Sequence, residues 1–84
     1  MEITYESRWK EELVGTIGKH HFVVQLTMGV FHVYFPTEAT WRKKAPRWAK
    51  GKWEEAKEAV LAWCENEKTP ITIEDDAWVE FVKK

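Results

Sequence analysis

The sequence predicts one small α+β domain, an antiparallel β-meander of three to five strands with one amphipathic α-helix packed on one face. Two observations lead to this prediction. Apolar and polar residues alternate with a period of two through the first half of the chain, which is typical of half-buried strands. Residues 52–66 instead repeat apolar side chains at helical spacing. The chain has 84 residues, so we expect a single domain over 1–84.

The first two predicted strands lie before a short turn. Residues 3–8 alternate between apolar and polar side chains, and Leu13–Ile17 form a second strand that contains Gly15. Gly18 and Lys19 then suit a two-residue type II′ turn, because glycine adopts the positive φ required at its first central position. We therefore expect a hairpin that leads into the next strand.

The strongest strand predictions are His21–Thr27 and Val30–Phe35, which are rich in β-branched and aromatic residues. A turn at Met28-Gly29 would place apolar residues opposite one another on one side of the sheet. The expected pairs are Phe22 with Phe35, Val24 with Val33, and Leu26 with Phe31. Leu13 and Ile17 fall on the same side, which is therefore the predicted core face.

The opposite sheet face is more apolar than a solvated face usually is. It would carry Val14, Thr16, His21, Val23, Gln25, Val30, His32 and Tyr34. We expect something to cover part of it: the first strand, a tryptophan, or a second copy of the protein. The residues predicted to form this interface are Val14, Val23, Val30, His32 and Tyr34.

The middle of the chain predicts a short helical stretch followed by a longer helix. Thr37 can cap a helical turn that begins at Glu38, and Pro46 ends any helix there. The helix predicted over about 52–66 has one apolar stripe, which should pack on the core face. The stripe consists of Trp53, Ala56, Val60, Trp63 and Cys64.

The end of the chain allows two structures. Ile71–Ile73 and Trp78–Val82 can form a hairpin around an acidic turn. Thr72 and Asp75 also resemble a capping box, which would make a strand followed by a helix. The β-branched and aromatic residues favour the hairpin.

The segment 41–53 combines six cations, no acid and three tryptophans, so it carries +6 while the rest of the chain carries −7. Cations that follow phosphates and aromatic faces that stack on bases are features of single-stranded nucleic-acid binders. An acidic protein would also suit the charge, and the tryptophans could instead turn inward and leave the cations solvated. The residues predicted to contact an anionic partner are Trp41, Arg42, Lys43, Lys44, Arg47 and Trp48.

No catalytic, metal or cofactor motif is evident. Neighbours His20 and His21 point to opposite faces of a strand and cannot share a metal ion. Cys64, the single cysteine, lies on the helix stripe near its C-terminal end and is expected to be an unreactive core thiol. An aromatic pocket lined by Trp53, Trp63 or Trp78 could hold a small ligand.

The overall charge of −1 does not indicate a whole-protein nucleic-acid field. The first residues lack the basic-then-apolar layout of a signal peptide, and no apolar run is long enough to cross a bilayer, so we expect a cytoplasmic protein. No family signature is recognised. The sequence therefore favours a non-catalytic binding module that associates with itself as a homodimer or with a protein partner; nucleic-acid binding and small-ligand binding are the alternatives.

Overall fold

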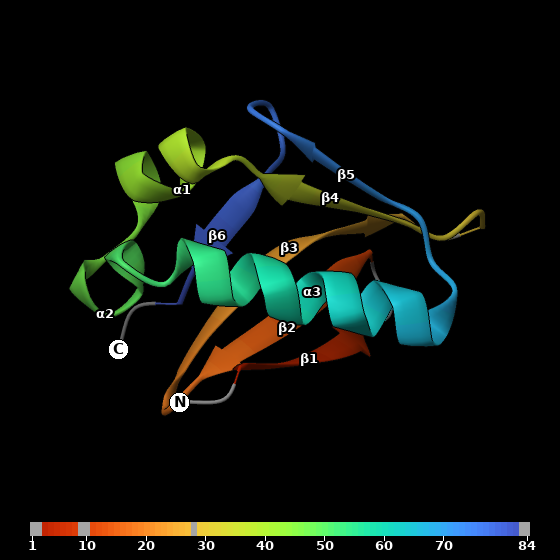
Figure 1. The fold of residues 1–84 in the computed structure, drawn as a ribbon, viewed down its shortest axis with the longest axis horizontal. Helices are drawn as coiled ribbons and strands as arrows, with labels where there is room; N and C mark the ends of the chain where they lie inside the picture. The colour runs from red at the N-terminus through yellow and green to blue at the C-terminus, as the bar shows by residue number, and fades with distance from the viewer. Residues whose placement is uncertain (1–2, 9–10, 28, 83–84) are drawn as a thin grey trace.

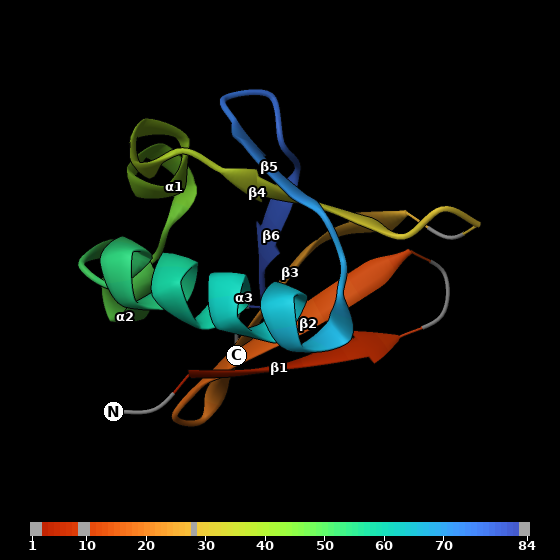
Figure 2. The same cartoon turned by 45° about the vertical axis from the view of Figure 1, so that its right-hand side comes forward.

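The computed structural model describes residues 3–8, 11–27 and 29–82. Helix α3 crosses one face of a curved sheet, and α1 and α2 lie near the N-terminal end of α3 (Figures 1 and 2). The elements in chain order are β1 (Ile3–Arg8), β2 (Glu12–Ile17), β3 (His20–Thr27), β4 (His32–Pro36), α1 (Glu38–Lys44), α2 (Arg47–Lys50), α3 (Trp53–Glu67), β5 (Ile71–Glu74) and β6 (Val79–Phe81). The predicted α+β class is confirmed.

Strands β1 to β4 form the predicted antiparallel meander. Ile17 pairs with His20 around the two-residue turn, and Gly18 has φ of 60°, as the expected turn requires. Gly15 lies between β1 and β3, opposite Phe22. A Cβ atom there would lie 2.3 Å from the nearest atom of the Phe22 ring. The absence of a side chain thus lets this ring lie over the β2 backbone.

The register predicted between β3 and β4 is wrong by two residues. Leu26 pairs with Val33, not with Phe31, and Thr27 pairs with His32. Residues 29–31 form a turn before β4, so Phe31 lies outside the strand and is 53% exposed. A two-residue shift keeps every side chain on its face because the side-chain period is two, so the apolar pattern could not distinguish these registers.

Strand β6 occupies the position that the prediction gave to the end of β4. Phe22 pairs with Phe81 and Val24 with Val79, so the predicted pairs of Phe22 with Phe35 and Val24 with Val33 do not form. Strand β4 separates from β3 after the pair Gln25–Tyr34. The edge of β3 is therefore shared by two strands from distant parts of the sequence.

The C-terminal segment contains two strands, as its residue types indicate, but they do not form a hairpin. Strand β5 pairs with β4 in parallel, and β6 pairs with β3. The sheet is thus six-stranded and antiparallel except for one parallel pair. Parallel pairing needs a long crossover connection, and here α1, α2 and α3 supply it.

Helix α3 packs its predicted stripe on the core face. Ala56, Val60 and Cys64 are buried, while Trp53 and Trp63 are partly buried. The Tyr5 hydroxyl reaches from β1 to donate a hydrogen bond to the carbonyl of Ala56 at 2.8 Å. The predicted core residues of the sheet are buried apart from Phe31; they are Leu13, Ile17, Phe22, Val24, Leu26, Val33 and Phe35.

Candidate functional site

The tryptophans of the basic segment serve the core. Trp41, predicted as a contact residue, is fully buried, with edge-to-face contacts to Phe22 and Phe81 at centroid distances of 5.0 and 4.9 Å. Its indole N–H donates to the carbonyl of Ala49 at 2.7 Å. This bond joins α1 to α2 and satisfies a polar group that would otherwise be costly to bury. Trp41 therefore has no face to offer a partner.

The other two tryptophans are partly buried and also engaged. Trp48 stacks on His20, with 4.5 Å between ring centroids and 11° between ring planes. The Trp53 indole N–H donates to the Pro36 carbonyl at 2.9 Å, and Lys57 lies over its ring at 5.1 Å. One face of each ring is therefore already occupied. The inward alternative considered for these side chains is the arrangement in the structure.

The cations of the same segment remain at the surface. Arg42 pairs with Glu38 at 3.0 Å within α1, and Lys52 lies 3.8 Å from Glu55. The other four are exposed, and no carboxylate of the described residues lies within ion-pair distance of them. We call this set the basic end: Lys43, Lys44, Arg47 and Lys50, on α1 and α2.

The position of α1 is determined by contacts at its start and at its middle. Thr37 caps the helix by accepting from the Thr40 amide at 3.4 Å. Thr37 and Thr40 hydroxyls also donate to Asp75, to its carboxylate and to its carbonyl respectively. Together with buried Trp41, these contacts hold α1 against the loop between β5 and β6. The acidic turn therefore has a structural role that the sequence did not indicate.

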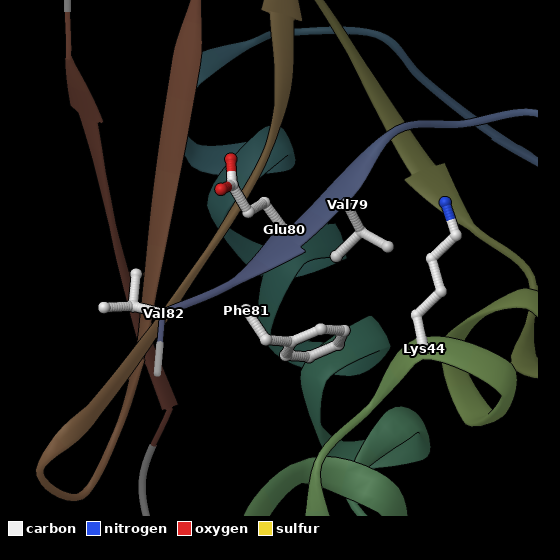
Figure 3. A pocket seen from close by; sticks show the side chains of 5 residues that line it. All are labelled: Lys44, Val79, Glu80, Phe81 and Val82. Carbon is white, nitrogen blue, oxygen red and sulfur yellow. The ribbon is translucent and has the colours of Figure 1, made fainter. Parts of the chain in front are cut away.

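An open hollow of about 510 Å³ lies between the C-terminal end of α1 and β6 (Figure 3). Its lining residues are Lys44, Val79, Glu80, Phe81 and Val82. One member of the basic end therefore stands beside a strand. The β6 residues were not predicted to be part of a site, although their β-branched and aromatic side chains favoured a strand. Their position beside a hollow depends on pairing with β3, which sequence spacing cannot show.

The predicted interface residues of the second sheet face do not form one apolar surface. Val14 is buried, Val23 and Tyr34 are partly buried, and His32 stacks on Tyr34 and bonds to Thr72 at 2.7 Å. Val30 lies in the loop between β3 and β4 instead of in a strand, and it is 82% exposed. In the observed register, Glu6 lies beside Val14 and Glu80 lies beside Val23, so carboxylates flank these two valines on the second face.

The small-ligand hypothesis predicts a pocket between helix and sheet, where the described residues enclose a small hollow. Phe31 and Trp63 help to line a space of about 130 Å³ between α3 and the sheet, below the several hundred Å³ of ordinary ligand pockets. Cys64 is buried, and burial raises the pKa of its thiol from 9.0 to about 11. In the part of the chain that the structure describes, no three His, Cys, Asp or Glu side chains gather to hold a metal ion.

Comparison of the chain with protein-family models, with curated proteins and with solved structures gives no match. Among residues 3–8, 11–27 and 29–82, no helix is both long and apolar enough to cross a membrane. The proposals below therefore rest on the geometry of the basic end and of β6.

Proposed function

We propose that this chain is a non-catalytic module that binds an acidic protein segment at its basic end. The observation that carries the proposal is the set of four exposed cations, Lys43, Lys44, Arg47 and Lys50, without a carboxylate partner among the described residues. Cations that are not already paired are available to an incoming anion, and a cluster of one sign accelerates encounter with an oppositely charged partner.

The helices that carry these cations are fixed in place, which favours a binding role over a solvated connection. Trp41 is buried in the core and bonded to Ala49, and Asp75 holds the start of α1. A cluster of cations on a rigid support loses less conformational entropy on binding than one on a mobile loop. The arrangement is therefore suited to recognition.

An acidic protein suits this surface better than nucleic acid does. Single-stranded binders need aromatic faces for the bases, and here Trp41 is buried while Trp48 is stacked on His20. A protein partner needs only carboxylates at suitable spacing. The phosphate contacts that the cations could still make would not by themselves distinguish sequences.

The test is titration of the protein with fluorescent poly-glutamate and with a single-stranded oligonucleotide of equal charge, each at two salt concentrations. We expect salt-sensitive binding of poly-glutamate that exceeds binding of the oligonucleotide. A charge-reversed Lys44→Glu/Arg47→Glu variant should bind poly-glutamate about tenfold or more weakly, since two attractive contacts become repulsive. Lys68→Glu, at the far end of α3, is the control for a charge reversal outside the basic end; it reverses one charge where the double variant reverses two, and it should change little.

Two results would contradict the proposal: equal affinity of the double variant and the Lys68→Glu control, or tighter binding of the oligonucleotide. Thermal melts of all variants exclude loss of folding as the cause of weaker binding. Sedimentation velocity on the same samples tests the other candidate function, self-association, for which exposed Val30 and Phe31 at the β3–β4 loop are the supporting observation. A concentration-dependent dimer that Val30→Ser abolishes would support it.

A further inference from the structure

Strand β6 has a strand on only one side. It pairs with β3, and no other strand of the described residues pairs with it. Strands β1 and β5, at the ends of the sheet order, also have one unpaired edge. At β6, a hollow touches every residue of the strand, and Lys44 stands across it. An unpaired edge with space beside it can accept an additional strand.

The outer edge of β6 carries backbone groups without a hydrogen-bond partner among the described residues, at two residues that are otherwise mostly buried, Val79 and Phe81. The Val82 amide donates to the His21 carbonyl at 3.0 Å, so the antiparallel alternation also directs the backbone groups of Glu80 toward β3. The N–H and C=O groups of Val79 and Phe81 then point away from β3. No hydrogen bond to these groups is formed by the described residues. They present two donors and two acceptors in a row.

The hollow follows the edge of the strand and does not lie over one face of it. Its lining includes four consecutive residues, Val79 to Val82. Side chains in a strand alternate between faces, so a space touched by all four lies at the edge. Figure 3 shows the side chains of Val79 and Phe81 on the side of Lys44, with Glu80 and Val82 turned the other way.

We propose that an extended part of the acidic partner adds to the free edge of β6 as a further strand. This inference rests on the proposed function and specifies how the partner binds. The charges beside the edge also define a pattern. Side chains of the added strand on the α1 side would meet Lys44, whereas those on the other face would lie beside Glu80. Acidic residues are therefore favoured at alternate positions, with uncharged or basic residues between them.

The experiment uses a short blocked peptide in which glutamate alternates with threonine, and two versions of it that are N-methylated on alternate sets of amides. Only one set of amides can face β6 in an added strand. We expect methylation of that set to weaken binding about tenfold or more, through lost hydrogen bonds and steric conflict at the edge, while the other set binds within about twofold. The peptide should also slow amide hydrogen exchange at Val79 and Phe81.

Failure of this inference can be told apart from failure of the proposed function. If both methylated peptides bind like the parent, and Lys44→Glu still weakens all three, the acidic-partner function stands and strand addition is overturned. If neither the peptide nor poly-glutamate binds, both proposals fall. A peptide-free dimer in which the Val79 and Phe81 amides are already protected would also overturn strand addition by a partner, since a second copy would occupy the edge.

Discussion

The two edges of β3 differ in how they are covered. On one side, β2 pairs with β3 without interruption, from Glu12–Gln25 to Ile17–His20. On the other side, β4 covers three residues, and β6 then covers the next three. Between Tyr34 and Val79 the chain forms three helices and β5. One edge is thus built from a local hairpin alone, and the other combines a local hairpin with β4 and a pairing with β6 that is distant in sequence.

This difference separates an edge that stabilises the sheet from one that could bind a partner. The β2 side of β3 is fully occupied, because β2 pairs with it from Gln25 to His20. The shared edge ends in β6, which is only three residues long and has a hollow on its other side. Low pairing density is characteristic of segments that take part in binding. The binding proposal accordingly lies on the long-range edge.

The largest expected effect comes from breaking the long-range edge at Trp41. This residue contacts β6 through Phe81 and β3 through Phe22. Trp41→Ala should lower the free energy of unfolding by about 3–5 kcal/mol, through lost burial and a cavity. Urea unfolding followed by circular dichroism measures the change. Trp48→Ala, at a partly buried ring, is the comparison and should cost less; an equal or smaller loss for Trp41→Ala would show that Trp41 does not secure this edge.

A smaller effect is expected from breaking the local edge at Gly15. A Cβ atom at this position would lie 2.3–2.8 Å from three atoms of the Phe22 ring. Gly15→Ala should therefore lower the unfolding free energy by about 1–3 kcal/mol, as overpacking does. Gly51→Ala is the matched control, because its added Cβ has no neighbour within 4 Å. Equal melting temperatures for the two variants would contradict the close approach of Phe22.

The smallest expected effect is a change in folding stability at alkaline pH, and it concerns the contact between β1 and α3. Burial raises the pKa of Cys64 to about 11 and, with the nearby Cys64 charge, raises the pKa of Tyr5 well above 10.0. In the folded protein both groups stay neutral to a higher pH than in the unfolded chain. Their burial therefore contributes its full stabilisation at pH values below the pKa values of the unfolded state. For Cys64 it is lost as the pH rises from about 9 toward 11; for Tyr5 the loss begins near pH 10. Chemical unfolding at several pH values should show a shallower alkaline decline for Cys64→Ala and for Tyr5→Phe than for the wild type. An unchanged slope in both variants would argue against burial of these groups.

The segment 41–53 shows how much can be predicted from residue types alone. Thr37, just before this segment, and Pro46 within it predicted the helix cap and a helix end before Pro46. Residue types could not assign Trp41 to the core and Lys44 to the surface, because they do not show which side chains of a helix face the rest of the protein. That assignment follows from the rotation of α1 against β6.

The sequence by itself determined the α+β class, the meander of β1 to β4, the faces of its strands and the buried stripe of α3. These follow from periodicity, turn chemistry and capping, which act between neighbouring residues. Only the tertiary structure decided the β3–β4 register, the parallel pairing of β5 and the pairing of β6 with β3. Shifts by two residues preserve burial, and the pairing of distant strands depends on how the intervening helices pack. The proposed binding edge belongs to this second group.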